Sequence, residues 1–541
     1  MKILLAVVFL FLLGVDMVFF ENIADQIIYL YYSGKITLLL FYLVVSFLGF
    51  LSISMIFFIS NKIIYIFFLL FLVVTYAIDA VYKNINSVGF SLNDLTVALA
   101  EVDAFAIDAL KTYATALEKT ALLVVMLFIF AYIIRKIVHK HHFYVSLKLF
   151  IPLFLVASLL SYFIFFRTLG ATQSRPTSLK VSTIISYYAT NSLYYGEHQT
   201  LKKELATTSK YKNIILIVDE SIGGKYLSIN GYDKETTPYL KSIKKQYINL
   251  GLASSSANCS ASSNILLMSG IQPTQLPDTA NNILKQPNIF QYAKKAGYTT
   301  HYISGQSIND RLQNYMSPFD LKFIDDFSQP KEKYRHKTMP EEDVVVATKK
   351  ALQQSQKNFI YIVKHGAHFQ WENSYPKKNK IFLPTLGSED ALTLDKKEEA
   401  INSYLNAIRY NVDLFFQKFL QEVAFFERDD TLIIYTSDHG QSILEEGRVA
   451  THCDSTNPPL SQGIVPLLLF TPKNDTLMNS FEFKQNIYSH YEIMPTIKKL
   501  MGYEVEAKTF FDVKENNYTQ EFVSGDIFGR ASLEFNDINL K

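Results

Sequence analysis

Long apolar stretches with few charges dominate the first third of the chain. Each has close to the roughly 20 residues that an α-helix needs to cross the hydrocarbon core of a bilayer. No small-residue cleavage site follows the first stretch, so we expect a retained helix rather than a signal peptide. We therefore predict a transmembrane domain over residues 1–170. Its five expected helices are Ile3–Phe20, Ile36–Ile59, Ile63–Val81, Ala121–Ile137 and Leu147–Phe166.

Loop charges predict how these helices are oriented. The segment Arg135–Lys148 is rich in Arg, Lys and His, which is typical of a cytoplasmic loop. Five crossings then place the N-terminus in the cytoplasm and everything after Phe166 outside. Asp16 and Asp79 could mark a pathway through the membrane, but a position near the interface is the commoner case and the one we expect. Residues 83–119 are expected to form amphipathic helices on the membrane surface.

The rest of the chain shows a different pattern. Residues 171–211 are polar with a Tyr-rich segment, which indicates a linker with interfacial helices. From 212 to 541, short β-rich apolar runs alternate with helical patterns such as Glu398–Val423. This alternation indicates an α/β domain with a largely parallel sheet and helices on both faces. The expected strands are Asn213–Val218, Thr299–Ile303, Phe359–Val363, Leu432–Thr436 and Val465–Phe470.

Composition agrees with one membrane part joined to one soluble part. The 541 residues are 49% hydrophobic, and the excess lies in the first third. A formal net charge of +2 gives no electrostatic reason to expect nucleic acid as a partner.

Acidic and histidine residues follow several of the expected strands. Glu220 follows the first, His368 the third, and Asp438 and His439 the fourth, while His452 lies in the next loop. In parallel sheets, ligands bind beyond the carboxyl ends of the strands. A lone His or a chance Asp-His pair is weak evidence, but four such segments in one domain are much stronger. Carboxylates and imidazoles converging at one sheet edge predict a zinc site.

A serine-rich stretch from Ser256 to Gly270 predicts a loop that leads into a helix. Its small hydroxyl residues precede an apolar run, so a hydroxyl would lie on the first helical turn. The unpaired N–H groups and the helix dipole there favour a phosphoryl or sulfuryl group. A simple helix cap is the alternative and, for this stretch taken alone, the commoner case. The metal-ligand pattern elsewhere in the chain shifts the balance toward a nucleophile.

Four motifs support a resemblance to a known group of enzymes. They are I-I-L-I-V-D-E-S around Glu220, S-D-H-G-Q-S around Asp438, H-G-A-H-F-Q around His368 and T-H-C at His452. Together they resemble the alkaline phosphatase and sulfatase superfamily, and within it the membrane-anchored phosphoethanolamine transferases of Gram-negative bacteria. The resemblance covers essentially the whole chain. It implies a five-helix transmembrane bundle followed by an alkaline-phosphatase-like, doubly wound sheet domain.

The resemblance also implies roles for individual residues. Glu220, Asp438 and His439 would bind zinc, and His368 and His452 would act in catalysis. Ser260 would be the nucleophile and a further zinc contact, in place of the usual Thr. Its spacing to Ser269-Gly270 favours Ser260, whereas counting from the family's upstream cysteine favours Ser263, and Ser262 is a further alternative. The resemblance places both cysteines, Cys259 and Cys453, near the site, so a disulfide between them is a hypothesis. We expect Gln306, Asn309 and Arg311 to contact the donor head group or the acceptor.

The activity that the resemblance implies is zinc-dependent transfer of phosphoethanolamine through a covalent intermediate. The donor would be phosphatidylethanolamine and the acceptor a cell-envelope glycolipid or glycan, such as lipid A or lipooligosaccharide core. The chain would span the bacterial inner membrane among membrane lipids, with residues 212–541 as a periplasmic catalytic domain. Alternatives are a glycerophosphate transferase, a sulfatase, or a non-catalytic membrane protein with a degenerate hydrolase domain. A sulfatase is disfavoured because Ser262 and Asn264 stand where its maturation motif has Pro and Arg.

Overall fold

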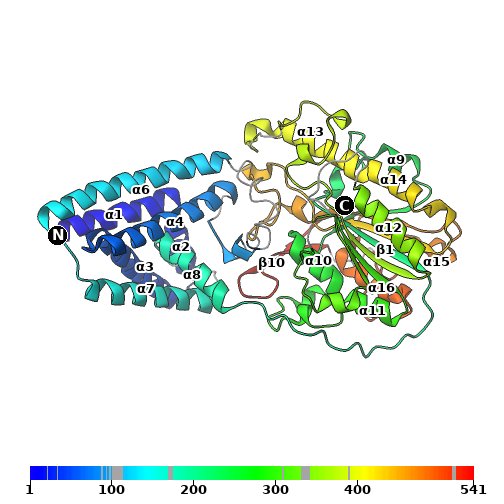
Figure 1. Ribbon diagram of the computed structural model, residues 1–541, viewed down its shortest axis with the longest axis horizontal. Helices are drawn as coiled ribbons and strands as arrows, with labels where there is room; N and C mark the ends of the chain where they lie inside the picture. The colour runs from blue at the N-terminus through cyan, green and yellow to red at the C-terminus, as the bar shows by residue number, and fades with distance from the viewer. Residues whose placement is uncertain are drawn as a thin grey trace. The chain divides into compact units, whose positions relative to one another are not determined.

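The protein consists of two compact units, seen in the ribbon of Figure 1. One comprises Met1–Ser192 with Arg530–Ser532, and the other Leu193–Gly529 with Leu533–Lys541. The boundary falls inside the expected linker. The computed structural model describes residues 1–20, 22–32, 34–86, 89–92, 94–96, 99, 114–168, 175–306, 310–330, 341–387, 390, 392–514 and 520–540.

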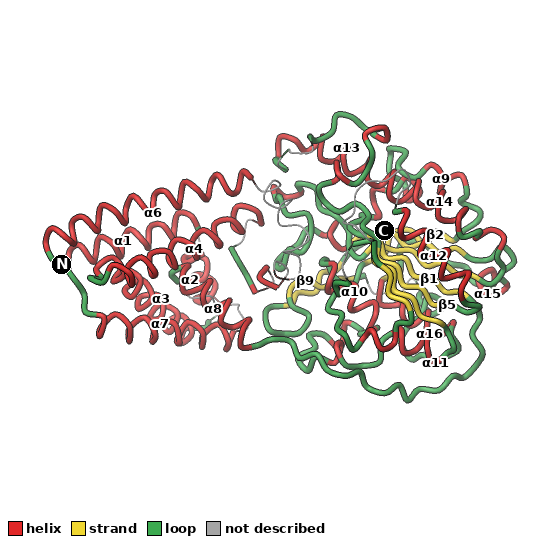
Figure 2. The backbone as a smooth tube through the Cα atoms, viewed as in Figure 1, coloured by secondary structure: helices red, strands yellow, loops and turns green. Residues whose placement is uncertain are grey.

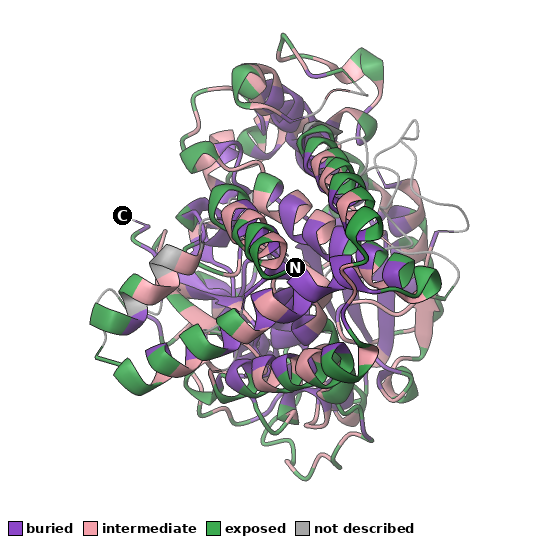
Figure 3. Cartoon of the chain, turned by 90° about the vertical axis from the view of Figure 1, so that its left-hand side faces the viewer, coloured by how far each residue is buried: buried purple, intermediate pink, exposed green. Residues whose placement is uncertain are grey.

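The first unit is helical, and five of its helices are long and apolar enough to cross a membrane. Their outward faces are exposed and their inward faces buried (Figure 3). This confirms the expected five-helix bundle. Of the two further helices, α2 was not predicted, whereas α8 lies in the segment 171–211 where linker helices were expected. The surface helices expected in 83–119 lie mostly outside the described residues. The helices are α1 (Lys2–Phe19), α2 (Asn22–Tyr32), α3 (Ile36–Met55), α4 (Lys62–Asn86), α6 (Ala114–His141), α7 (Leu147–Thr168) and α8 (Thr177–Thr190).

A buried ionic cluster joins α8 to α1 and α4. Asp16 and Asp79 are both fully buried. Lys180 places its Nζ 2.6 Å from Asp79 Oδ1, and Arg175 places a guanidinium nitrogen 3.3 Å from Asp16 Oδ1. The hydroxyl of Thr177 also donates to Asp16 Oδ1, at 2.8 Å. The two carboxylates that the sequence placed near the interface are therefore paired inside the bundle.

Removing one cation from this cluster should destabilise the bundle. We expect Lys180→Met to lower the free energy of unfolding by about 3–5 kcal/mol, because Asp79 then stays buried without its closest cation. Unfolding of the detergent-solubilised chain measures the effect, with the exposed Lys148→Met as control. The double variant Lys180→Met/Asp79→Leu should recover most of the loss. Equal destabilisation of the single and double variants would contradict this interpretation.

The second unit is built on an eight-stranded sheet with the order β4-β3-β5-β1-β6-β7-β2-β8. Among these strands β7 runs antiparallel to its neighbours β6 and β2, while the other pairs are parallel. The expected largely parallel sheet is thus confirmed. The strands are β1 (Asn213–Asp219), β2 (Ile248–Ser254), β3 (Thr299–Ser304), β4 (Asp326–Ser328), β5 (Asn358–Val363), β6 (Thr431–Ser437), β7 (Ile464–Phe470) and β8 (Tyr488–Ser489), with a separate hairpin of β9 (Glu521–Gly525) and β10 (Leu533–Asp537).

Helices cover both faces of this sheet, as the central strand β1 shows. Ile214, Leu216 and Val218 pack into one core with α10, α11 and α16, while Ile215 and Ile217 pack into a second core with α9, α12, α13 and α14. Figure 2 shows α11 and α16 on one side of the strands and α9 and α14 on the other. All seven residues of β1 are buried. A strand covered on both faces reads as a continuous apolar run, which is why the sequence revealed it. The helices are α9 (Pro238–Ser242), α10 (Ser260–Ser269), α11 (Ile289–Lys295), α12 (Glu342–Gln354), α13 (Lys397–Ile408), α14 (Phe415–Glu422), α15 (Thr476–Asn479) and α16 (Ile493–Leu500).

Candidate active site

The carboxyl ends of β1 and β6 bring the first group of polar residues together. The two strands are parallel neighbours, with Asp219 opposite Ser437, so the residues that follow them are adjacent. Ser221 adopts a left-handed φ of 60° directly after Glu220. Its N–H donates to Asp438 Oδ1 at 3.1 Å, and its hydroxyl donates to Glu220 Oε1 at 2.8 Å. The turn after β1 therefore holds both carboxylates in place.

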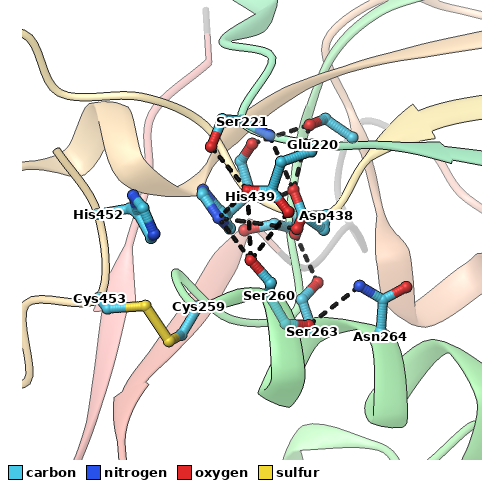
Figure 4. A network of polar contacts seen from close by, with 12 residues as sticks. Glu220, Ser221, Cys259, Ser260, Ser263, Asn264, Asp438, His439, His452 and Cys453 are labelled. Carbon is cyan, nitrogen blue, oxygen red and sulfur yellow. Dashed lines mark hydrogen bonds and ion pairs between the residues drawn. A yellow bond between two sulfur atoms is a disulfide. The ribbon is translucent and has the colours of Figure 1, made fainter. Parts of the chain in front are cut away.

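Ser260 is the first residue of α10, as the sequence predicted for a nucleophile. The helix cap position belongs to Cys259, so Ser260 is not the cap. The Ser260 hydroxyl lies 3.1 Å from Glu220 Oε2 and 3.1 Å from His439 Nε2 (Figure 4). By contrast, the hydroxyl of Ser263 donates to the carbonyl oxygen of Asp438 at 2.5 Å. Of these two serines, Ser260 is the one whose hydroxyl faces the carboxylate and imidazole.

These residues fit a divalent metal ion. Glu220, His439 and His452 each offer a ligand atom, and the three atoms lie within 4.8 Å of one another. Asp438 Oδ2 is buried and accepts no hydrogen bond from any described residue. A buried carboxylate oxygen without a donor is costly, and a cation would satisfy it. Carboxylate oxygens and imidazole nitrogens are ligands that zinc takes. The expected set of Glu220, Ser260, Asp438 and His439 is thus brought together, with His452 close enough to add a ligand.

The protonation states of the site follow from burial and mutual charge. Burial alone would raise the pKa of Glu220, but the hydrogen bond and charge of His439 outweigh it and lower the pKa well below its usual value. Burial would lower the pKa of His439, yet the charges of Asp438 and Glu220 raise it to about 9. Burial and the nearby Glu220 raise the pKa of Asp438. Loss of solvent and the charge of His439 lower the pKa of His452. In the metal-free protein these directions favour an ionised Glu220 beside a protonated His439.

A row of imidazoles extends outward from His439. The ring of His452 stacks on His439 with a centroid distance of 4.4 Å. The ring of His368 lies 6.4 Å from His452, and His365 lies 5.8 Å from His368. The structure thus brings His368 and His452, both expected in the site, to one side of the carboxylates. His365 was not predicted, although its position three residues before His368 in the same loop was a usable signal.

Gln306 lies beside a candidate metal ligand. Its amide donates to Glu220 Oε2 at 2.8 Å and to the carbonyl oxygen of Lys364 at 3.0 Å. It therefore orients a candidate metal ligand, and its expected contact with the head group or the acceptor stays a prediction. Asn309 lies outside the described residues, and the expectation for Arg311 stays a prediction.

A disulfide joins two segments that supply residues to the site. Cys259 and Cys453 are bonded, with a Cα–Cα distance of 4.6 Å (Figure 4). The bond links the residue before Ser260 to the residue after His452. The disulfide hypothesis is confirmed, and two segments that supply site residues are covalently joined.

His490 is a buried histidine next to the helix that begins at Ser260. It is buried, its Nδ1 accepts the N–H of Ser256 at 3.2 Å, and its Nε2 lies 2.9 Å from the hydroxyl of Thr436. Nδ1 also lies 3.3 Å from the Ser263 hydroxyl, and a proton on Nδ1 would face the N–H of Ser256. Burial lowers the pKa of His490 to about 3. The neutral ring is therefore part of the folded structure.

The buried His490 should make stability fall in mild acid. Its pKa of about 3 when folded lies below the roughly 6.5 of an unfolded His, so only the unfolded chain takes up a proton as the pH falls below that value. The free energy of unfolding should drop by roughly 1–1.5 kcal/mol between pH 8 and pH 5.5 from this residue alone. Urea unfolding of the wild type and His490→Gln at both pH values isolates the effect. Identical pH dependence in the two proteins would contradict it.

Comparison with known proteins adds a family and a fold. The family model described as Sulfatase matches residues 212–503. The chain is 25% identical over 309 residues to the Kdo(2)-lipid A phosphoethanolamine 7''-transferase of Escherichia coli K12, covering 54% of this chain and 51% of the relative. It is 25% identical over 289 residues to phosphoethanolamine transferase EptA of Helicobacter pylori, covering 51% of this chain and 52% of the relative. The matches therefore span about half the length of these curated relatives.

Two solved structures resemble the fold. The integral membrane lipooligosaccharide phosphoethanolamine transferase A of Neisseria meningitidis matches with a TM-score of 0.60 and 17% identity, over 92% of this chain and 95% of that one. The zinc complex of the C-terminal periplasmic domain of EptC from Escherichia coli matches with a TM-score of 0.51 and 19% identity, over 63% of this chain and 96% of that one. At such identities the likeness shows the fold, and the first match confirms the expected combination of helical bundle and sheet domain.

Proposed function

Because the chain belongs to the sulfatase family, we propose that it is a membrane-bound phosphoethanolamine transferase that uses zinc and Ser260. The observation that carries the proposal is the Ser260 hydroxyl, 3.1 Å from a carboxylate oxygen of Glu220 and 3.1 Å from His439 Nε2. A hydroxyl at a helix N-terminus inside a carboxylate and imidazole cluster suits nucleophilic attack on phosphorus. The relatives named as phosphoethanolamine transferases support phosphoethanolamine as the group that is transferred.

Phosphatidylethanolamine is the donor in this proposal, and a cell-envelope glycolipid or glycan is the acceptor. Five helices that can cross a membrane suit a lipid donor. The names of two relatives, which specify lipid A and lipooligosaccharide, support a glycolipid acceptor. The second unit would lie in the periplasm, as the name of the EptC domain indicates for that protein, with the helices in the inner membrane.

In the first step the Ser260 oxygen attacks the donor phosphorus, and the bond from phosphorus to the diacylglycerol oxygen breaks. Zinc held by Glu220, Asp438 and His439 would favour loss of the Ser260 proton and offset negative charge on the phosphoryl oxygens. The N-terminus of α10 favours the same charge. A neutral His452, next to His439, or His368 beyond it would take the Ser260 proton and then give it to the departing diacylglycerol oxygen. Phosphoethanolamine remains on Ser260 as a phosphodiester.

In the second step an acceptor oxygen attacks the same phosphorus. His368 or His452 takes the proton of the acceptor hydroxyl, and the bond between phosphorus and the Ser260 oxygen breaks. Ser260 recovers its proton, so the enzyme returns to its starting state. The roles of Ser260, His368 and His452 in this scheme are the ones that the sequence resemblance implied.

A donor assay tests the proposal. Purified protein in detergent is incubated with zinc and either fluorescent phosphatidylethanolamine or fluorescent phosphatidylglycerol, and labelled diacylglycerol is separated by chromatography. We expect release from phosphatidylethanolamine that a chelator abolishes and zinc restores. Release from phosphatidylglycerol alone would replace the proposal with a glycerophosphate transferase, and release from neither lipid would overturn it.

A further inference from the structure

A fully buried lysine lies beneath the candidate active site. Lys364 follows β5 and is 0% exposed. Its Nζ is 2.6 Å from Asp219 Oδ2, 3.6 Å from Glu341 Oε1 and 2.6 Å from the carbonyl oxygen of Asn411. The ammonium also lies 4.0 Å from the centre of the Phe415 ring. Burying an ammonium and two carboxylates in an apolar core is costly, and packed apolar side chains could fill the same space. The cluster therefore calls for an explanation beyond stability.

Each of the two carboxylates accepts a main-chain N–H beside the site. Asp219 Oδ1 accepts the N–H of Glu220 at 3.1 Å, immediately before the candidate metal ligand. Glu341 Oε1 accepts the N–H of Gly366 at 3.1 Å. Gly366 belongs to residues 365–368, which we call the histidine loop because His365 and His368 stand at its ends. Lys364 thus joins the carboxylate that holds the end of β1 to the carboxylate that holds the histidine loop.

The histidine loop and the end of β1 also touch directly. Gly366 has a φ of +57°, and a Cβ at this position would lie 2.4 Å from Asp219 Oδ1 and 2.8 Å from the main-chain nitrogen of Glu220. Only glycine fits such an approach. The side chain of Gln306 spans the same gap, since it donates both to Glu220 Oε2 and to the carbonyl oxygen of Lys364. Any movement of Lys364 would therefore change the spacing between Glu220 and His368.

We propose that Lys364, Asp219 and Glu341 form a positioning cluster that fixes the histidine loop relative to the metal-binding end of β1. Its effect on the loop needs no ligand, whereas its consequences for zinc and for transfer rest on the proposed function. The three are positioning residues, because they contact the main chain of the site and not the reacting hydroxyl. Removing a group that orients a metal ligand typically lowers metal affinity or activity 10–100-fold.

The test compares Lys364→Met and Glu341→Leu with a matched control. Lys357→Met removes a lysine from the other end of β5, where the ammonium donates to the carbonyl oxygen of Ala296 and lies over the Tyr298 ring. Amide hydrogen exchange of residues 364–368 is followed in the metal-free full-length chain. The zinc dissociation constant is measured by competition with a chelator. Diacylglycerol release gives kcat and KM for the donor lipid.

We expect both cluster variants to exchange the Gly366 amide at least about tenfold faster and to bind zinc roughly 10–100-fold more weakly. Their kcat should fall by about tenfold or more while KM for the donor changes little, because the cluster does not contact the lipid. Lys357→Met should match the wild type in all three measurements. If Lys364→Met does not fold, Lys364→Met/Asp219→Asn replaces it and carries the same expectation, since it removes the repulsion between the two carboxylates.

Folded cluster variants with wild-type exchange and wild-type zinc affinity would overturn the proposal. A Lys357→Met variant whose histidine-loop amides exchange as fast as those of the cluster variants would also overturn the proposal. A wild type that releases no diacylglycerol or binds no zinc would overturn the proposed function alone. In that case the exchange measurement on the metal-free chain still decides whether the cluster positions the loop.

Discussion

Ser260→Ala is expected to lower the rate of phosphoethanolamine transfer by at least about a thousandfold while the protein stays folded. The variant removes the oxygen that we propose attacks phosphorus, and that hydroxyl makes its described contacts with Glu220 and His439 rather than with the helix. Zinc should still bind, because Glu220, Asp438 and His439 remain. Diacylglycerol release and zinc content, measured on the same preparation, check both parts of this expectation.

Ser263→Ala is the matched control for this result. The Ser263 hydroxyl donates to the carbonyl oxygen of Asp438, so its removal costs a buried hydrogen bond of about 1 kcal/mol. We expect transfer to stay within about tenfold of the wild type, because a small shift of Asp438 affects positioning only. An active Ser260→Ala together with an inactive Ser263→Ala would exchange the roles of the two serines.

Asp438→Asn should have opposite effects on metal affinity and on the stability of the metal-free protein. Zinc affinity and transfer should both fall by about a hundredfold or more, because a charged ligand becomes a neutral amide. Without metal, the variant should be more stable than the wild type. Asp438 Oδ2 is buried with no donor from any described residue, and the charge of Glu220 lies beside it.

Chelator competition and thermal unfolding with and without zinc measure these two effects. Asp475→Asn is the control, since Asp475 is also a buried aspartate but caps α15 by accepting the N–H of Met478. That variant should lose stability, because the Asn amide nitrogen cannot accept the hydrogen bond that the Tyr211 hydroxyl donates to Asp475 Oδ2, and it should keep its zinc affinity. A metal-free Asp438→Asn that is less stable than the wild type would show that the carboxylate is satisfied without a cation.

The sequence predicted five of the eight strands of the main sheet, and the residues that follow them, because both depend on local patterns; β2, β4 and β8 were not predicted as strands. β1 and β6 are continuous apolar runs, and Glu220, Asp438 and His439 come directly after them. The direction of β7 could not be predicted, because an apolar run reads the same in a parallel and an antiparallel strand. The expected helix Glu398–Val423 is observed as α13 and α14 joined by a π-helical segment, Arg409–Leu414, which helical spacing does not distinguish.

Partners far apart in sequence were beyond the reach of such patterns. Arg175 contacts Asp16 across 159 positions, and Gln306 reaches Glu220 across 86. Lys364 read only as the residue before a histidine, and its burial between two carboxylates follows from the packing of β5 against β1. Contacts between residues far apart in sequence leave no periodic pattern. The residues that orient the site could therefore be identified only from the structure.

The central claim is that Ser260 carries phosphoethanolamine during transfer. The most direct measurement is peptide mass spectrometry of the zinc-loaded protein after incubation with phosphatidylethanolamine and rapid acid quenching, without an acceptor. We predict that a fraction of the peptide containing Ser260 carries the added mass of one phosphoethanolamine group, and that Ser260→Ala shows none. An unmodified peptide during continuing diacylglycerol release, or the added group on another residue, would contradict the account.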